Sequence, residues 1–454
     1  MRRGEIEGRI DVQFHAENPS IKDCIKLGEF VKIKGGKRIP KGLSYSGEET
    51  DFWYLRVDDI DAYGNIKSQN LKHISAEIFE ALENYELKPN EIVISIAGTI
   101  GKITLLDCLP AKRIILTENC AKLQIKSKNL SPKFLAIILS LPFVQKQMAL
   151  AYIRTTIPKL GLERIYNLKI PPIPSPEIQT RIIEKFEAAY NAKRAKESQA
   201  KSLLDGVDAY LLERLGMRTP IAAETKKTFF VRYANISGNR FDASAYRQSF
   251  NYDSSKFQVE RLSKIAFINP KVTFEKLDIN SEISFVPMEV INEHEGAIEE
   301  LRSKKVRETK GFTRFREGDL IWAKITPCMQ NGKSAVARNL KQGFACGSTE
   351  FYVIRPRTKA ISVDYLHFLL RNKRVLENAR NFFGGSAGQQ RVSVDFLKNF
   401  QVPVPPMEIQ EEIAAHIQSI RARVKELERE AQAEVERAKA EVERMILGEV
   451  PAGE

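Results

Sequence analysis

The chain has 454 residues, enough for two or more domains with separate hydrophobic cores. Its 43% hydrophobic and 28% charged residues are ordinary for a globular protein, and no apolar run approaches the roughly 18 residues needed to span a membrane. The five scattered cysteines form no C-x-x-C pair, which argues against a cysteine-based zinc site and favours a reducing cytoplasm. The net charge of +13 is informative about partners rather than fold.

The first 170 residues have the pattern of a mixed α+β globule. After a basic, glycine-containing stretch, "VKIKGGKRIPKG", come short alternating apolar runs such as "EIVISI" and "AKLQIK", which predict strands. The segment "SPKFLAIILSLPFVQKQMA" predicts a helix. A proline-rich turn follows, and residues 176–215 then continue to Gly216 without a further proline. Proline at the start and glycine just past the end predict one long helix, with Ser175 as its N-cap.

The second half repeats this plan after a linker predicted at residues 217–238. The runs "LIWAKI" and "FYVIR" predict strands, and "SVDYLHFLLRNKRVLENA" predicts a helix. A second long helix is predicted from Met407 to Leu447, before Gly448. Its apolar residues recur at the 4-3 spacing of a coiled coil, so we expect the two long helices to pack together. The alternative is two independent helices on the surface.

Three separate matches at one offset indicate an internal duplication. Arg9 and Asp11 align with residues 240 and 242, "SPKFLAIILSLPFVQ" aligns with "SVDYLHFLLRNKRVL", and Gln179 aligns with Gln410, all 231 residues apart. That period is too long for a solenoid and indicates a duplicated domain pair. The predicted fold class is therefore α+β with a pseudo-two-fold internal repeat. Its segments are residues 1–170, a long helix in 171–216, a linker and second globule in 217–401, and a second long helix in 402–454.

The segment "ITPCMQNGKSAVA" resembles the end of a nucleotide-binding P-loop, but its duplicate argues against that function. Gly332 and Lys333 align with Gly101 and Lys102, where no hydroxyl residue follows the lysine. A P-loop also needs a helix after its Gly-Lys, and both copies read instead as a strand, a loop, Gly-Lys and a strand. We find no metal-binding constellation and no N-P-P-[FY] or D-P-P-[FY] motif of an amino-methyltransferase.

The positive charge belongs to the globular parts. Residues 177–215 hold seven basic and seven acidic residues, and residues 408–447 hold seven basic and ten acidic. The helices therefore carry a net charge of −3, which leaves +16 for the rest of the chain. Basic clusters near glycines, such as those around Lys37 and Lys304, are typical of surfaces that follow a phosphate backbone, although any one of them can be a solvated face.

Nearly the whole chain resembles the specificity subunits of Type I restriction-modification systems. The resemblance rests on the duplicated plan and on "LGEFVKIKGGKRIPKG", "AGTIGK", "GGSAGQQRVSVDFLKNFQVPVPPMEIQ" and "IPPIPSPEIQ". The family's Pro-Pro-x-x-Glu-Gln signature is matched loosely, because Glu177 and Glu408 stand two residues before Gln179 and Gln410, and the first copy has "PSP" in place of the proline pair.

The resemblance implies that each globule is a target recognition domain that reads half of a bipartite double-stranded DNA site. The two long helices would pack antiparallel as a coiled coil and separate the domains, so about 37 residues would span about 55 Å, or roughly 16 base pairs. The resemblance also implies two methyltransferase subunits as partners, together with restriction or translocase subunits, and no membrane. S-adenosylmethionine would be bound by the methyltransferase subunit that flips the target adenine, so this chain would hold no cofactor and carry no catalytic or metal-binding residue.

The predicted DNA-contacting residues come from the basic clusters and from two loops in each half. Their amide, hydroxyl and cationic side chains can read base edges or hold phosphates, although each can equally be an ordinary loop residue. They are Lys34, Lys37, Arg38, Gly98, Thr99, Gly101, Lys102, Arg154, Thr155 and Thr156 in the first half, and Lys304, Lys305, Lys324, Gln330, Asn331, Gly332, Lys333, Gln389, Gln390 and Arg391 in the second.

Three alternatives remain open at this point. The chain can be the specificity subunit of a system outside Type I, whose partner fuses methyltransferase and nuclease. It can be an enzyme with a site of unrecognised pattern. It can also be a coiled-coil scaffold that binds only protein, in which case DNA binding would be weak and insensitive to salt.

Overall fold

The computed structural model describes residues 24–61, 64–67, 71–106, 112–151, 159–217, 255–385 and 389–446. The chain divides into two compact units: the first comprises residues 1–196 and 429–454, and the second comprises residues 197–428. Each unit contains a globular α+β part and a portion of both long helices. Apart from Met217, the linker predicted at 217–238 lies outside the described residues.

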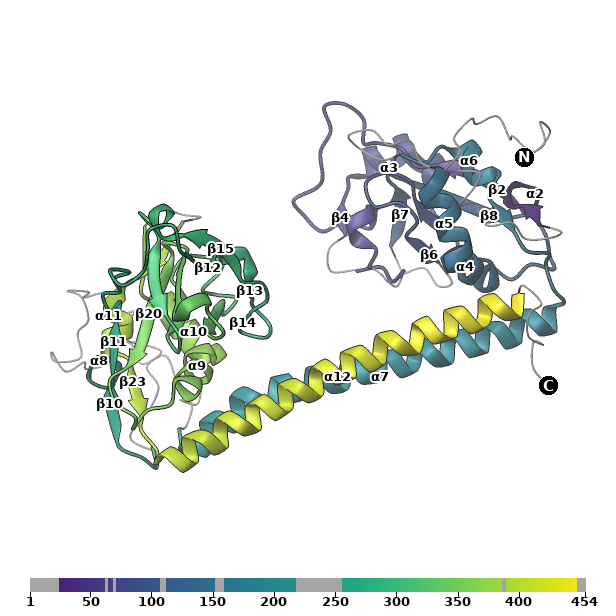
Figure 1. Ribbon diagram of the computed structural model, residues 1–454. Helices are drawn as coiled ribbons and strands as arrows, with labels where there is room; N and C mark the ends of the chain where they lie inside the picture. The colour runs from purple at the N-terminus through teal and green to yellow at the C-terminus, as the bar shows by residue number, and fades with distance from the viewer. Residues whose placement is uncertain are drawn as a thin grey trace. The chain divides into compact units, whose positions relative to one another are not determined.

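The globular part of the first unit is built on two sheets (Figure 1). One has the order β2 (Val31–Gly35), β8 (Cys120–Ile125), β5 (Ile92–Ser95) and β6 (Ile103–Leu105), with all neighbours antiparallel. The other has the order β4 (Lys72–His73), β3 (Phe52–Leu55) and β7 (Arg113–Leu116), with β3 and β7 parallel. The remaining elements are β1 (Ile25–Lys26), α2 (Leu27–Phe30), η2 (Val57–Asp59), α3 (Ala76–Leu82), η4 (Glu83–Tyr85), α4 (Pro132–Ser140), α5 (Pro142–Ala151), α6 (Leu162–Tyr166) and β9 (Lys169–Ile170).

The second unit has two sheets of the same kind. One has the order β11 (Ala266–Ile268), β20 (Phe351–Pro356), β17 (Leu320–Ala323) and β18 (Ser334–Val336). The other has the order β15 (Arg302–Lys305), β12 (Glu282–Val286), β19 (Phe344–Gly347) and β16 (Thr313–Arg316), with β12 and β19 parallel. The remaining elements are β10 (Val259–Arg261), α8 (Leu262–Ile265), η7 (Met288–Val290), β13 (Ile291–Asn292), β14 (Ala297–Ile298), η8 (Val306–Glu308), η9 (Lys341–Gly343), α9 (Val363–Arg371), α10 (Lys373–Arg380), β21 (Phe383–Gly384), β22 (Arg391–Val392), α11 (Val394–Asn399) and β23 (Gln401–Pro403).

The matching sheets confirm the internal repeat predicted from the sequence. Strands β8 and β20 occupy the same place in the order of their sheets, and their residue numbers differ by 231. All four residues of β5 and all four of β17 are buried, so neither strand has the exposed face that an alternating pattern indicates. Among the described residues of the first unit, the place of β16 is taken only by an isolated antiparallel bridge between Glu86 and Ile115 on β7.

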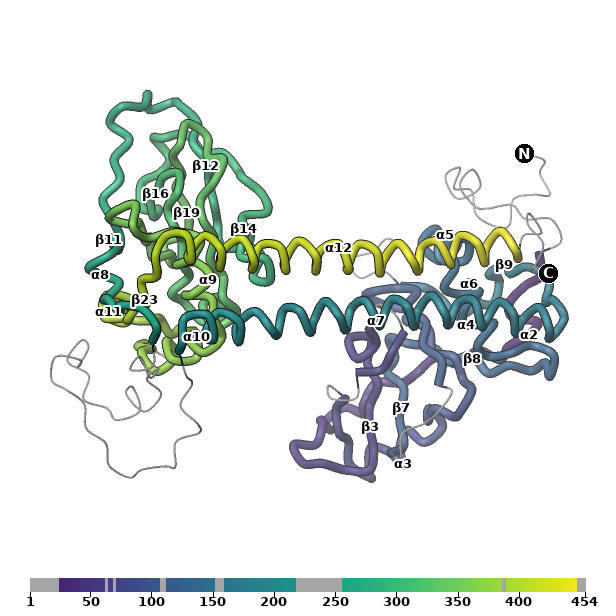
Figure 2. Tube along the Cα trace, turned by 90° about the horizontal axis from the view of Figure 1, so that it is seen from below, coloured from purple at the N-terminus to yellow at the C-terminus, as the bar shows by residue number. Residues whose placement is uncertain are grey.

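The two long helices are α7 (Pro176–Leu215) and α12 (Met407–Ile446), each of 40 residues, as predicted. They run side by side and antiparallel (Figure 2). In the first unit Lys196 on α7 pairs with Glu430 on α12 at 3.1 Å, and in the second unit Arg214 pairs with Glu412 at 2.6 Å. Exposed ion pairs of this kind contribute about 0 to 1 kcal/mol each, so they specify register more than they add stability.

Apolar contacts hold the helix pair together and join it to each globule. Ala200 on α7 packs with Val424 and Leu427 on α12 in a small cluster of its own. In the first unit Ile182 on α7 and Val442 on α12 are fully buried in the core, and in the second unit Leu215 and Ile413 are. The apolar stripes are therefore covered by each other and by the globules, which excludes the alternative of two independent surface helices.

A buried glutamine fixes the start of each long helix. In the second unit the Gln410 side chain accepts the backbone N–H of Ser362 at 2.8 Å and donates to the carbonyls of Ala360 and Pro405. In the first unit Gln179 makes the corresponding three hydrogen bonds, to Ser131, Asn129 and Pro174, each 231 positions earlier. The glutamine of the predicted family signature therefore ties the proline-rich turn to the loop before the preceding helix.

No single helix of the described segments is long and apolar enough to cross a membrane. The bent pair α4 and α5 passes the same test by length and composition alone.

Candidate nucleic-acid interface

A hairpin loop follows the buried strand β5 in the first unit and the buried strand β17 in the second. In the second unit the loop runs from Ala323 to Lys333, and the Ala323 N–H donates to the Lys333 carbonyl at 2.9 Å to close it. In the first unit Ser95 and Lys102 make the same closure at 3.0 Å, across a loop three residues shorter. The predicted strand, loop, Gly-Lys and strand is therefore confirmed in both units.

The glycine at the end of each loop has a conformational role. Gly101 has φ of +86° and Gly332 has φ of +72°, in the left-handed region that side chains with a Cβ rarely adopt. Within the second loop the Gly332 N–H donates to the carbonyl of Met329, whose side chain is buried in the core. Both loops are thus closed at their base by a backbone hydrogen bond, and in the first unit Thr99 is exposed at the tip.

The lysine after each glycine points into its own unit. The Lys102 Nζ donates to the carbonyl of Ile60 at 2.6 Å and of Val57 at 3.2 Å, at the short helix η2. The Lys333 Nζ donates to the carbonyl of Met288 at 3.3 Å, which belongs to η7 and lies 231 positions after Val57. Both ammonium groups are therefore used within the fold, and we leave these two lysines out of the proposed DNA contacts.

The structure brings together the two predicted loops of the second half, and in the first half it places Lys159, the end of one predicted loop, beside the hairpin loop. In the second unit Ile325 forms a β-bridge with Arg391, and the Thr326 N–H donates to the Gln390 carbonyl at 2.9 Å. In the first unit Ala97 bridges Lys159 in the same way. The predicted residues Arg154, Thr155 and Thr156 lie outside the described residues, as do residues 386–388 of "SAGQQR".

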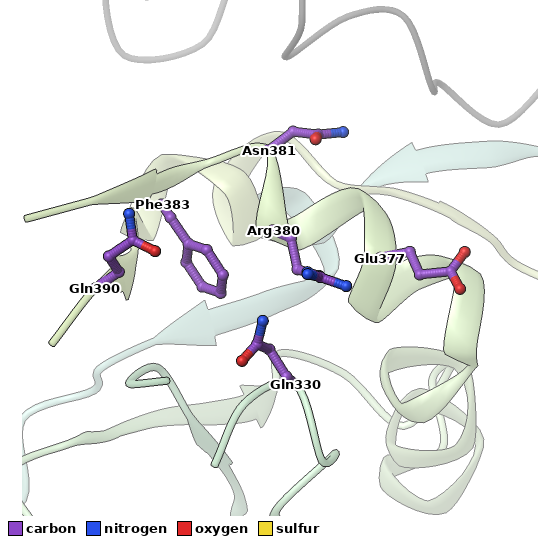
Figure 3. Close-up of a pocket in the computed structure, with 6 residues that line it drawn as sticks. All are labelled: Gln330, Glu377, Arg380, Asn381, Phe383 and Gln390. Atoms are coloured by element: carbon purple, nitrogen blue, oxygen red, sulfur yellow. The ribbon is translucent and has the colours of Figure 1, made fainter. Parts of the chain in front are cut away.

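In the second unit these two loops border a hollow of about 480 Å³. The six lining residues come from the hairpin loop, from α10 and the turn after it, from β21 and from the segment before β22 (Figure 3). They are Gln330, Glu377, Arg380, Asn381, Phe383 and Gln390. Of these, only Gln330 and Gln390 were predicted from the sequence.

The side chains around the hollow have the chemistry of a base-reading surface. The carboxamides of Gln330 and Gln390 each offer donors and an acceptor, and Arg380 adds a guanidinium. Within the described segments, no protein group forms a hydrogen bond with the Asn381 Nδ2, although it is buried. Amide and guanidinium groups are those that pair with purine edges in the major groove, and the Glu377 carboxylate can accept from a cytosine amine. Phe383 presents an apolar face beside them (Figure 3).

Several predicted side chains beside the hollow are already paired within the protein. The Arg391 guanidinium donates twice to the Glu350 carboxylate, at 2.7 and 2.9 Å, and lowers the pKa of that carboxyl. Asn331 donates to Glu293 at 3.0 Å, and the Lys324 ammonium lies 5.4 Å from the centre of the Tyr352 ring. These contacts orient the rim, and DNA would have to compete for the same groups. Gln389 is exposed at the end of the second loop.

The two basic clusters belong to different sheets. Lys34 and the neighbouring Lys37 and Arg38 lie on and after β2; the Lys34 Nζ donates to a backbone carbonyl at 2.8 Å, and Arg38 pairs with Glu118 at 2.6 Å. Lys304 and Lys305 lie on the edge strand β15, where the Lys304 ammonium sits over aromatic rings. The Lys37 side chain is exposed, and its backbone N–H donates to the Leu116 carbonyl at 3.0 Å. The clusters are therefore not equivalent parts of the repeated frame.

In the part of the chain that the structure describes, no group of three or more His, Cys, Asp or Glu side chains is placed to hold a metal ion. What the geometry provides is a repeated frame that carries a hairpin loop of different length and sequence in each unit.

Two segments of the chain match one family of DNA specificity domains. The chain belongs to the family described as Type I restriction modification DNA specificity domain, which matches residues 20–203 and again residues 254–437. The two matched segments each contain one globule and the larger part of one long helix. The resemblance inferred from the sequence is thereby confirmed.

The chain is similar to two specificity subunits from Escherichia coli. It is 37% identical to the Type I restriction enzyme EcoAI specificity subunit over 171 residues, which are 37% of this chain and 29% of the relative. It is 40% identical to the Type I restriction enzyme EcoEI specificity subunit over 146 residues, 32% of this chain and 24% of the relative. The chain thus matches less than a third of the length of either relative.

A solved structure shows the same fold. It comes from work on complex assembly and conformational transition of the type I R-M system, and the chain matches it with a TM-score of 0.54 at 17% identity. The match covers 95% of this chain and 99% of the other.

Proposed function

We propose that this chain is the DNA-recognition subunit of a Type I restriction-modification enzyme. One observation carries the proposal: the same loop position on a duplicated frame holds different residues in the two units, with a hollow lined by amide, guanidinium and carboxylate side chains in the second. Two differing surfaces in one chain correspond to a target in two parts. The family membership and the excess of positive charge in the globules support DNA as the ligand.

The proposed target is a bipartite sequence with an unread spacer. Each pair of loops, near Thr99 in the first unit and near Gln330 in the second, would read one half-site. The spacer length would follow from the paired long helices, whose 40 residues each extend about 60 Å at roughly 1.5 Å per residue.

The proposed partners are two methyltransferase subunits, joined by restriction or translocase subunits, in the cytoplasm. The methyltransferase would bind S-adenosylmethionine and carry out the chemistry, and this chain would supply the address without a cofactor or metal. The internal repeat supports two docking sites, because a pseudo-two-fold frame presents similar surfaces twice.

The proposal is tested by equilibrium DNA binding of the purified complex with and without this chain. We expect sequence-preferring binding only when the chain is present, with an affinity that falls steeply as salt is raised because phosphate contacts release counterions. Purified alone, the chain should transfer no methyl groups and hydrolyse no DNA or ATP. Turnover without a partner would contradict the proposal, and weak binding that is insensitive to salt would favour a protein-binding scaffold.

A further inference from the structure

The base of the second recognition loop is held by an arginine that sequence analysis did not single out. Arg371, the last residue of α9, donates its Nη1 to the Gly332 carbonyl at 2.5 Å. Its Nη2 donates to the carbonyls of Glu293 at 2.7 Å and His294 at 3.1 Å. One guanidinium thus joins the end of the loop that bears Gln330 to the turn between β13 and β14.

The same turn is also tied to a long helix. Arg421 on α12 donates its Nη1 to the Glu295 carbonyl at 2.7 Å, and Lys425, one turn further along, lies 3.4 Å from the Glu295 carboxylate. The turn comes so close to Arg371 that a Cβ at Gly296 would lie 2.6 Å from Nη1. The β13–β14 turn is therefore clamped between the end of α9 and α12.

The residues after Arg371 complete a connection to the other long helix. The Asn372 Nδ2 donates to the Asp208 carbonyl on α7 at 3.3 Å, and the Lys373 ammonium pairs with Asp205 at 3.0 Å. The contacts of α7 with Asn372 and Lys373, and those of α12 with the β13–β14 turn, thus converge on Arg371, which donates to Gly332 at the base of the loop. All of these residues belong to the second unit.

The chemistry of Arg371 is suited to this connection and to no simple replacement. Its two Nη atoms donate to backbone carbonyls of two separate segments, Gly332 on one side and Glu293 and His294 on the other, whereas an ammonium carries all its donors on one nitrogen. Burial and the nearby Arg421 charge lower the pKa of Arg371 to about 9, so the site tolerates the cation at a cost. A group held at such a cost is expected to be needed for the position of what it binds.

The first unit holds the matching glycine carbonyl in a different way. There the Gln145 Nε2, from α5, donates to the Gly101 carbonyl at 2.9 Å and to the Leu139 carbonyl at 2.7 Å. An amide that bridges two nearby carbonyls replaces the guanidinium. The two loops thus have separate anchors of different chemistry, which makes each a control for the other.

We propose that Arg371 is a positioning residue that sets the second recognition loop relative to the long helices and thereby fixes specificity for one half-site only. The inference rests on the proposed function, because it assumes that the loop reads DNA. Gln145 has the corresponding role for the other half-site. Neither residue needs to touch DNA.

The test uses the complete complex of this chain with its methyltransferase subunits. Methylation is measured on two sets of DNA probes. One set carries single base changes in the first half-site, and the other carries them in the second. We expect Arg371→Met to lower discrimination at the second half-site by roughly tenfold, in the range lost with one good base contact, and to leave the first unchanged. Gln145→Leu should do the reverse, and Arg374→Met, an exposed arginine on the neighbouring helix α10, should change neither.

The outcomes separate the inference from the function on which it rests. Wild-type complex that discriminates at neither half-site would overturn the proposed function. Wild-type discrimination that Arg371→Met leaves intact, or an equal loss at both half-sites, would overturn the positioning role. If Arg371→Met does not fold, Arg371→Lys keeps the charge but loses the fork, and the same half-site-specific loss is expected from it.

Discussion

Gln410 on the first turn of α12 accepts the backbone N–H of Ser362 at 2.8 Å, just before α9 begins. With its two donated hydrogen bonds, this buried amide satisfies three backbone groups. Gln410→Leu keeps the volume but leaves those groups unpaired, so we expect a loss of about 2 to 3 kcal/mol in the free energy of unfolding. Chemical denaturation of the purified chain measures this loss.

A glutamine elsewhere on the same helix provides the control. Gln432 is exposed, and its side chain donates only to Glu436, one turn along α12. Gln432→Leu should change the free energy of unfolding by less than about 0.5 kcal/mol. Equal effects of the two substitutions would show that Gln410 has no special structural role.

The lengths of α7 and α12 give a second prediction, about the unread spacer. Inserting seven residues into each helix keeps the apolar stripe in phase, because a coiled coil repeats every seven residues. The helices lengthen by about 10 Å, so the spacer should grow by roughly three base pairs while both half-sites stay the same. Sequencing the methylated sites of cells that carry the variant measures the spacer, and an unchanged spacer would refute a measuring role for the helices.

The repeated frame could be predicted from the sequence because it depends on residue types at fixed spacing. The apolar runs of β5 and β17, the proline and glycine boundaries of the long helices, and Gln179 and Gln410 are all visible as residue types at fixed spacing. The apolar runs form buried strands, the proline and glycine residues bound the long helices, and the two glutamines make matching hydrogen bonds. The pairing of the long helices followed for the same reason, since two unburied stripes need a partner.

A third prediction separates base reading from charge. Gln390→Leu should lower discrimination at one position of the second half-site by roughly tenfold, with little change in affinity for unrelated DNA. Lys305→Ala, on the edge strand β15, should weaken binding to all sequences alike and reduce the salt dependence by about one phosphate contact. Binding titrations at several salt concentrations, on matched and mismatched probes, distinguish the two effects. The reverse pattern would show that the hollow does not read bases.

The loop lysines and the hollow show where sequence reasoning stopped. Lys102 and Lys333 follow the same Gly-Lys pattern, and both donate to backbone carbonyls. Every residue has a backbone carbonyl, so the residue types in the sequence do not indicate which carbonyl a lysine reaches. Arg371 was missed for the same reason, since its recorded acceptors are carbonyls from three distant positions. Arg380 and Asn381 look like the ordinary end of a short helix until the fold places them beside Gln330.

His367 gives a fourth prediction, about pH. His367 lies on α9 and its side chain is buried. This burial, with the charges of Arg371 and Arg421, holds the pKa of His367 well below the ordinary value of 6.5. The ring therefore stays neutral in the folded chain but takes a proton in the unfolded chain as the pH falls through about 6.5. The stability of this region should fall by up to about 1.4 kcal/mol per pH unit below that value.

Hydrogen exchange of the α9 amides at pH 7.5 and 5.5, corrected for intrinsic rates, measures this effect. His367→Gln removes the titrating group and should make α9 protection less sensitive to pH, even if the variant is less stable overall. An identical pH dependence in the two proteins would show that His367 does not control it.

Methylated-base sequencing of cells that express this chain with its methyltransferase subunits tests the central claim most directly. The account predicts one methylated motif in two short parts, separated by a run of unread bases, that disappears when this chain is omitted. A continuous motif, or methylation that persists without the chain, would contradict it.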